Sequence, residues 1–147
     1  SLIRFAIVVN PSDTGCTGIF EASNGSEIDD IHLGTWQSAL LYEVANEWIN
    51  PTDEPLVLGE PQLLAAVHQM TGAVQLRRNS SALTDDDLAL PLKIPREQVY
   101  LGRTAYADCV PYHGSLSEIL VYSRAVSDAE LLEIEDYLQK KWACCAE

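Results

Sequence analysis

The sequence lacks any long hydrophobic run. Of its 147 residues 47% are hydrophobic, yet no apolar stretch approaches the roughly 20 residues that a transmembrane helix requires. A membrane-spanning role is therefore not expected. Internal repeats and low-complexity segments are also absent. The length then predicts one domain over residues 1–147, large enough to bury about 70% of the surface that the unfolded chain exposes.

Positive charge is scarce. Nine Lys and Arg stand against 22 Asp and Glu, which gives a formal net charge of −13. Such a field repels a phosphate backbone, and no basic stripe opposes it, so nucleic-acid binding is excluded. The acidic balance is compatible with cations or neutral sugars as partners.

Cysteine motifs of the metal-binding type are missing. The four cysteines are Cys16, Cys109, Cys144 and Cys145. They form no C-x-x-C pair and have no histidine at ligand spacing, so a zinc site is not expected. Neighbouring cysteines rarely bridge each other, because a disulfide favours Cα atoms about 5.5 Å apart in a particular orientation. In an oxidising compartment we expect Cys144 and Cys145 to pair elsewhere, with Cys16 and Cys109 or with another chain. Four cysteines allow three connectivities, and the sequence does not choose among them.

The clearest local pattern is a strand and a helix in the last third of the chain. Residues 116–122 form a β-branched and aromatic run that predicts a buried strand. Ser127 and Glu130 form a capping box, which predicts the start of a helix there. The predicted apolar stripe of this helix is Leu131, Ile134 or Glu135, Leu138 and Trp142. We expect Trp142 to anchor the helix on the rest of the domain.

Short strands separated by turns are predicted over most of the remaining chain. The predicted strands are 2–9, 18–23, 63–70, 73–78 and 99–103, with turns at Asn24-Gly25 and Thr71-Gly72. Residues 35–49 suit a helix or a strand, and strand is favoured because Trp36, Ser38, Leu40, Tyr42 and Val44 alternate. Loops are predicted at 51–61, 80–95 and 104–113, with an edge strand at 90–94. The pattern indicates an all-β antiparallel sandwich or jelly roll with one C-terminal helix.

Residues 114–130, GSLSEILVYSRAVSDAE, resemble the C-terminal signature of LamG-like jelly-roll domains in the concanavalin A-like lectin/glucanase superfamily. Residues 99–103 resemble the preceding strand of that family, and 63–68 with 74–77 its central hairpin. The resemblance covers most of the chain from Phe5 and implies a concanavalin A-like jelly roll. The chain departs from it at Arg78-Asn79-Ser80, where many relatives have Asp-Gly. It also lacks the usual leading strand and tryptophan-containing segment, which implies a shortened version.

The family resemblance also bears on localisation and catalysis. Its members are mostly secreted or surface-displayed, which implies disulfides and an extracellular location. No signal peptide is visible, so we expect any leader to have been removed. Glucanases of the superfamily carry a Glu-x-Asp-x-x-Glu motif, and here Glu27-Ile28-Asp29 has His32 in place of the second glutamate. We therefore expect no enzyme.

Other titratable residues favour structural roles. Glu133, Glu135 and Asp136 are interpreted as a solvated helix face. The three histidines, His32, His68 and His113, are scattered and are expected to be structural or exposed. Glu118 falls on one strand face with apolar residues, so it requires an ionic partner, for which Arg103 or Arg124 is the candidate.

The binding hypothesis depends on aromatic side chains near polar ones, because an aromatic face packs under a pyranose ring while polar groups hold its hydroxyls. The candidate ligand-binding residues are Trp36, Trp48, Tyr106, Asp108, Tyr112 and His113. A core position for Trp36 is an equal alternative. Laminin-type relatives bind calcium, which makes this ion the cofactor to consider. Its candidate ligands are Asp29, Asp30 and Asp108, with Asp85, Asp86 and Asp87 also weighed.

The sequence thus predicts a non-catalytic recognition module that binds a glycan or a protein surface. The alternative is a structural, assembly or adhesion domain of a larger surface or virion-type complex, as a homo-oligomer or as part of another assembly. A glycoside hydrolase is the third and most distant alternative.

Overall fold

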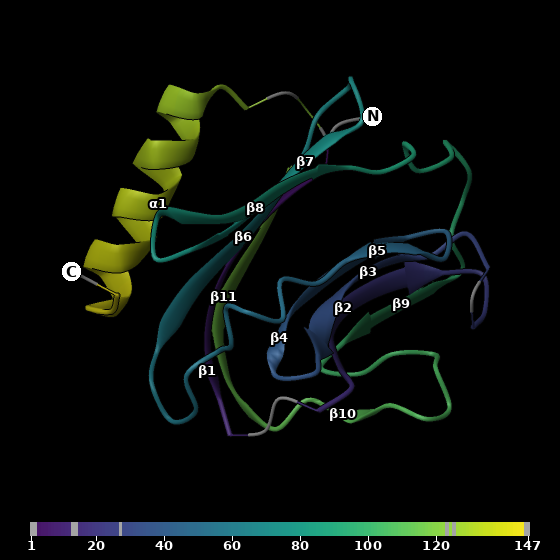
Figure 1. Ribbon diagram of the computed structural model, residues 1–147, viewed down its shortest axis with the longest axis horizontal. Coiled ribbons are helices and arrows are strands. Elements are labelled where there is room, and N and C mark those ends of the chain that lie inside the picture. Colours follow the sequence, from purple (N-terminus) through teal and green to yellow (C-terminus); the bar gives the residue numbers. More distant parts are fainter. Residues whose placement is uncertain (1–2, 13–14, 27, 123, 125, 146–147) are drawn as a thin grey trace.

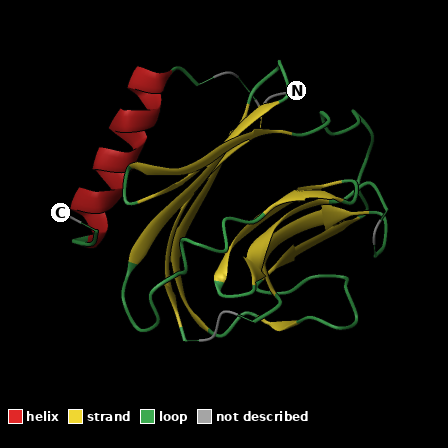
Figure 2. Ribbon diagram, viewed as in Figure 1, coloured by secondary structure: helices red, strands yellow, loops and turns green. Residues whose placement is uncertain are grey.

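The computed structural model describes residues 3–12, 15–26, 28–122, 124 and 126–145. It shows an antiparallel β-sandwich of jelly-roll type with one C-terminal helix (Figures 1 and 2), which confirms the predicted fold class. Leu2 and Glu27, which the sequence analysis included, lie outside the described residues. Nowhere in the described ranges does the chain form a helix with the length and apolar character needed to cross a bilayer.

In the described part of the chain, eleven strands form two sheets. The strands are β1 (Ile3–Pro11), β2 (Thr17–Ser23), β3 (Ile31–Trp36), β4 (Ala39–Val44), β5 (Glu47–Ile49), β6 (Gln62–His68), β7 (Ala73–Arg78), β8 (Ser81–Asp87), β9 (Gln98–Leu101), β10 (Val110–Pro111) and β11 (Gly114–Tyr122). The first sheet has the order β11-β1-β6-β7-β8. The second has the order β10-β2-β3-β4-β5, and β9 pairs with β2 beside β10. Pairing is antiparallel except between β10 and β2.

The main hydrophobic core fills the space between the two sheets. In β4 the alternate residues Leu40, Tyr42 and Val44 point into this core and are almost completely buried. Because successive strand residues face opposite sides of a sheet, Leu41 and Glu43 point to the outer face. The same alternation in β3 sends Ile31 and Leu33 inward and His32 outward. These two strands therefore present polar groups on the outer face of the second sheet.

The helix α1 (Asp128–Trp142) lies on the outer side of the first sheet (Figure 1). Both bonds of the predicted capping box are present between Ser127 and Glu130. Leu138 is fully buried and packs with Leu63 of β6 in a second, smaller core. The predicted anchor role of Trp142 is wrong, since this residue is 40% exposed. The terminal turn of α1 lies at the edge of the interface, so Leu131 and Leu138 supply the burial instead.

The surroundings of Glu135 on α1 and Glu118 on β11 differ from those predicted. Glu135 is buried rather than solvated, because its carboxylate faces the sheet and pairs with Arg77 Nε at 2.8 Å. Glu118 does form the expected ion pair, but with Lys141 Nζ at 2.8 Å, and it accepts a bond from Trp142 Nε1. Both donors are the last two residues of α1, whose end lies against Glu118 of β11. The hydrogen bond from Lys141 is the main cause that lowers the pKa of Glu118.

The former candidate partners of Glu118 lie elsewhere. Arg124 pairs with Glu130 at 3.0 Å, and the guanidinium carbon of Arg103 lies 4.1 Å from the centre of the Tyr100 ring.

Several strand boundaries also differ from prediction. Residues 35–49 contain the end of β3, then β4 and β5, separated by tight turns in which Gln37, Ser38, Ala45 and Asn46 have positive φ. The predicted loop 80–95 contains β8, and no strand forms at 90–94. Asn79 and Ser80 form the tight turn between β7 and β8, with φ of 50° and 69°. Asn24-Gly25 begins a longer loop between β2 and β3 rather than a two-residue hairpin.

The structure selects one cysteine connectivity, Cys16 with Cys109 and Cys144 with Cys145. The expectation that the adjacent cysteines pair elsewhere is wrong. Their Cα atoms are 3.7 Å apart, and the chain leaves α1 through left-handed conformations at Ala143 and Cys145. This turn directs both sulfur atoms to the same side of the backbone.

Candidate functional site

A hollow of about 550 Å³ lies on the outer face of the second sheet, between strands β3, β4 and β5 and the loop 104–109. Its lining combines aromatic, carboxylate and amide side chains. The lining residues are Cys16, Ser26, His32, Trp36, Leu41, Glu43, Asn46, Trp48, Tyr106, Ala107, Asp108 and Cys109.

Strand register builds the floor of the hollow. Glu21 of β2 is paired with His32 of β3, His32 with Glu43 of β4, and Glu43 with Trp48 of β5. Directly paired residues in antiparallel strands point to the same face. The register therefore places these four side chains in one row across the sheet, although they are far apart in sequence.

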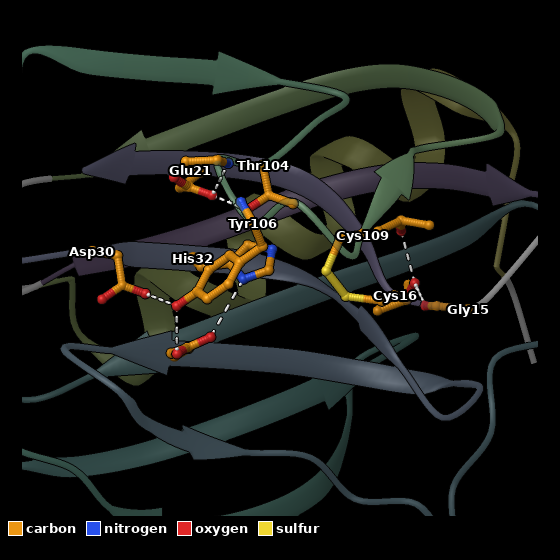
Figure 3. Close-up of a disulfide and its surroundings, with 12 residues drawn as sticks. Gly15, Cys16, Glu21, Asp30, His32, Thr104, Tyr106 and Cys109 are labelled. Atoms are coloured by element: carbon orange, nitrogen blue, oxygen red, sulfur yellow. Dashed lines mark hydrogen bonds and ion pairs between the residues drawn. A yellow bond between two sulfur atoms is a disulfide. The ribbon is translucent and has the colours of Figure 1, made fainter. Parts of the chain in front are cut away.

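Tyr106 covers this row from the loop. Its hydroxyl oxygen lies 2.9 Å from Asp30 Oδ2 and 2.8 Å from Glu43 Oε1, and its ring stacks on His32 with centroids 5.8 Å apart. Figure 3 shows Tyr106 above His32 with its hydroxyl directed toward Asp30. The hydroxyl has one proton, so it donates to one carboxylate at a time. The other contact is favourable only when that carboxyl itself holds a proton.

Burial shifts the pKa values of Asp30 and Tyr106. Asp30 is fully buried. Desolvation is the largest influence on the pKa of Asp30 and raises it above 3.8, the nearby charge of Glu43 raises it further, and the bond from Tyr106 opposes both. Burial also raises the pKa of Tyr106, and its bond to Glu43 adds to that shift. Tyr106 is therefore a neutral hydrogen-bond donor at physiological pH.

Three buried polar atoms beside Tyr106 make no hydrogen bond to any described residue: Asp30 Oδ1, His32 Nδ1 and His32 Nε2. His32 Nδ1 lies 3.5 Å from Glu43 Oε2, too long for a strong bond. Gly34 makes room for the imidazole, because a Cβ at that position would lie 2.5 Å from His32 Nε2 and 2.1 Å from the Thr17 carbonyl oxygen.

The loop 104–109 is attached to β2 at both ends. At its start, the fully buried carboxylate of Glu21 accepts bonds from the Thr104 hydroxyl and from the Ala105 N–H, the latter at 2.9 Å. At its end, the Cys16–Cys109 disulfide joins the loop to the residue before β2, with Cα atoms 4.7 Å apart. Both attachments are visible in Figure 3. They hold Tyr106 and Asp108 over the sheet.

The rim of the hollow is aromatic. Trp48 is 61% exposed and Trp36 is 42% exposed. Large apolar side chains with this exposure offer flat faces to a ligand. Asp108 is exposed at the same opening. The hollow thus combines stacking surfaces with groups that form hydrogen bonds.

Four of the six predicted ligand-binding residues, Trp36, Trp48, Tyr106 and Asp108, line this hollow. The other two do not. Tyr112 packs against the main core, and its hydroxyl donates to the Ser115 carbonyl at 3.3 Å. His113 is exposed and does not line the hollow.

Sequence reasoning missed His32, Glu43 and Asn46 as lining residues. Glu43 carried a usable signal, since it alternates with Leu40, Tyr42 and Val44 and so had to face outward.

The candidate calcium ligands are not gathered into a cage. Asp30 is bound by Tyr106, Asp108 is exposed in the hollow, and the backbone oxygen of Asp29 accepts a bond from Arg96. Across the described ranges no group of three or more His, Cys, Asp or Glu side chains is arranged to hold a metal ion. The calcium hypothesis stays a prediction.

The sequence matches no protein-family model and no curated protein. Solved structures share the fold. A putative carbohydrate binding protein from Bacteroides ovatus has a TM-score of 0.71 at 20% identity, over 89% of this chain and 40% of that chain. Domain 4 of AbnA, a GH43 extracellular arabinanase from Geobacillus stearothermophilus in complex with arabinotriose, has a TM-score of 0.70 at 15% identity, over 90% of this chain and 66% of that chain.

The CBM40 of the Ruminococcus gnavus IT-sialidase, bound to α2,3-sialyllactose, has a TM-score of 0.72 at 16% identity, over 91% of this chain and 82% of that chain. At these identities the similarity establishes the fold alone, a β-sandwich. This chain spans less than half of the Bacteroides ovatus protein and 66% of the AbnA chain.

Proposed function

We propose that this chain is a non-catalytic carbohydrate-binding module of the LamG-like type, and that it binds a glycan in the hollow on the outer face of the second sheet. One observation carries the proposal: Trp36 and Trp48 expose their rings beside Tyr106, Glu43 and Asp108 in a single hollow. Sugars are bound by such a pairing, in which an aromatic face contacts the C–H side of the ring and polar groups hold its hydroxyls.

The hydrogen bonds of the Asp30 and Glu43 carboxyl groups favour sugar binding over sugar hydrolysis as the function of the site. A glycosidase needs one carboxyl free to protonate the leaving oxygen and a second to act as nucleophile or base. Here Asp30 and Glu43 both contact the hydroxyl of Tyr106, and Asp30 is fully buried. Asp30 and Glu43 are therefore engaged with Tyr106 rather than free to act as the acid and base of a glycosidase.

An extracellular location fits the same proposal. The Cys16–Cys109 disulfide holds the loop that carries Tyr106 and Asp108. Such bonds persist in oxidising compartments, where glycans on cell surfaces and in the surroundings are accessible.

The first prediction tests the aromatic rim. Trp48→Ala is expected to weaken glycan binding about tenfold or more, because stacking on an exposed indole contributes on the order of 1 kcal/mol beyond area burial. The measurement is isothermal titration with the glycan that gives the strongest signal on an array. Trp142→Ala is the matched control, since it removes an exposed tryptophan from α1, on the other side of the first sheet. Equal losses for both variants would contradict the placement of the site.

The alternative, a structural or assembly domain, has a different signature. A chain that binds no glycan on the array and forms a defined oligomer in a solution mass measurement would favour it.

The calcium hypothesis is tested by thermal unfolding. An ion that binds only the folded state raises Tm, and the increase grows with the ratio of the free ion concentration to Kd. Equal Tm values in the presence of calcium and of a chelator would contradict the hypothesis that the folded chain binds calcium.

A further inference from the structure

The side chains that line the hollow include two carboxyl groups and neither Lys nor Arg. Glu43 and Asp108 contribute the carboxyl groups. Two more buried acids lie beside it: Asp30 contacts the Tyr106 hydroxyl, and Glu21 is paired with His32 in the sheet. The chain as a whole has a formal net charge of −13. A ligand that enters the hollow is therefore exposed to a negative electrostatic potential from the nearby carboxylates and from the net charge of the whole chain.

The nearest arginines do not compensate for these charges inside the hollow. Arg96 donates its Nε–H to the Asp29 carbonyl and its Nη1–H to the Leu92 carbonyl. Arg103 stacks on Tyr100 and lines an adjoining depression, which shares Tyr106 and Ala107 of the loop 104–109 with the hollow. Neither side chain lines the hollow.

The hydrogen-bonding groups of the hollow favour the same kind of ligand as its negative charge does. Ionised carboxylates accept hydrogen bonds and cannot donate them, so Glu43 and Asp108 suit the hydroxyl or ammonium groups of a sugar. The indole faces of Trp36 and Trp48 carry the negative side of the ring quadrupole, which attracts cations. A carboxylate or sulfate on the ligand would meet acceptors and aromatic faces of the wrong sign.

We propose that the hollow admits neutral and amino sugars and excludes acidic ones. This inference rests on the proposed function and adds the class of sugar. It separates this chain from the Ruminococcus gnavus module of the same fold, whose structure holds sialyllactose. The physical basis is local: two carboxylates lie within one hollow, and none of its lining residues is a Lys or Arg that would neutralise them.

The test is an array that carries neutral oligosaccharides, chitosan oligomers with free amino groups, and sialylated and uronate-containing glycans. Binding confined to the neutral and amino sugars supports the inference. Binding to sialylated or uronate glycans with equal or greater strength overturns it and leaves the proposed function intact. Binding to no glycan of any class overturns the proposed function and the inference with it.

A variant then tests whether the local charge is the cause. For the neutral glycan with the strongest signal, addition of a terminal sialic acid is expected to weaken binding about tenfold or more. Repulsion between two nearby charges has this size when the effective dielectric constant lies between that of water and that of a protein surface. Asp108→Lys should reduce this preference severalfold.

Glu133→Lys is the matched control, because it makes the same change of net charge on the exposed face of α1. It should leave the preference unchanged. An equal effect of both variants would assign the selectivity to net charge and overturn the role of the hollow.

Discussion

At the scale of single residues, the buried pair of Arg77 and Glu135 links the helix to the first sheet. The guanidinium donates from Nε to Glu135 Oε1 at 2.8 Å and from Nη2 to Oε2 at 3.1 Å. The side chains are 12% and 1% exposed. Removal of one partner from such a pair leaves an uncompensated buried charge, which costs more than the intact pair contributes.

We therefore predict that Arg77→Met lowers the free energy of unfolding by about 3 kcal/mol, as measured by urea denaturation. Arg78→Met is the matched control at the neighbouring position. Arg78 pairs with Glu54, whose side chain is 47% exposed, and a surface pair of this kind contributes less than about 1 kcal/mol. The double variant Arg77→Met with Glu135→Leu should recover most of the loss. A single-variant loss as small as that of the control would contradict the prediction.

Asp30 gives a prediction about pH. Its pKa is raised in the folded state, chiefly by burial, so the folded chain retains a proton over a pH range in which the unfolded chain has released it. Stability must then fall as pH rises from the unfolded value of about 3.8 through the folded pKa. Asn cannot titrate and keeps an acceptor oxygen for Tyr106. We expect Asp30→Asn to gain stability relative to the natural chain as pH rises from about 4 to 7.

Denaturant unfolding of both chains at several pH values measures this difference. A difference that does not change with pH would show that Asp30 titrates alike in the folded and unfolded chains.

The candidate site could be predicted only in part at this scale. Trp36, Trp48, Tyr106 and Asp108 were found because aromatic and acidic residues are the chemistry that sugar binding requires. His32 and Glu43 were not, because their place in the hollow depends on the register between β3 and β4, which sequence patterns do not fix. Tyr112 and His113 were chosen for the same chemistry, but the chain turns Tyr112 toward the core and leaves His113 outside the hollow.

At the scale of elements, the loop 104–109 is held by a disulfide that closes a long segment, since Cys16 and Cys109 are separated by 93 residues. Loss of a cross-link over such a segment raises the entropy of the unfolded chain. We predict that Cys16→Ser with Cys109→Ser lowers the free energy of unfolding by about 3 kcal/mol and weakens glycan binding, because Tyr106 and Asp108 lose one of their two attachments.

Cys144→Ser with Cys145→Ser is the matched control, because that bond joins neighbouring residues and closes no intervening segment. It should change stability by much less and leave binding unaffected. Calorimetry and titration of both variants decide the matter. Equal effects of the two double variants on glycan binding would show that the Cys16–Cys109 disulfide does not position the loop 104–109 for binding.

Element prediction succeeded where local chemistry decides the outcome. The capping box of Ser127 and Glu130 was readable because its bonds form within one turn. The strand β8 was missed because acids disfavour strands, yet Asp85, Asp86 and Asp87 lie at the edge of the sheet, where charge is tolerated and prevents pairing with other chains. Residues 35–49 carried the right alternation, but Asn46 and Ser38 adopt left-handed turns that the alternation could not reveal.

At the scale of the whole molecule, the two sheets have different outer faces. The helix covers the first sheet (Figures 1 and 2). The second sheet presents the hollow and its aromatic rim. The acidic surface also opposes association of identical copies. We predict that a solution mass measurement gives the mass of one chain, 16.2 kDa, with and without bound glycan. A dimer that dissociates when glycan is added would show that a second copy occupies the hollow.

The three tryptophans divide between the two outer faces, with Trp36 and Trp48 at the rim of the hollow and Trp142 on α1. This division gives the protein a built-in optical reporter. Replacement of Trp142 by phenylalanine would leave only indoles that border the ligand, so any change in their emission during a titration would arise at the rim. An unlabelled sugar could then be followed by fluorescence without a dye, a tag or an immobilised surface.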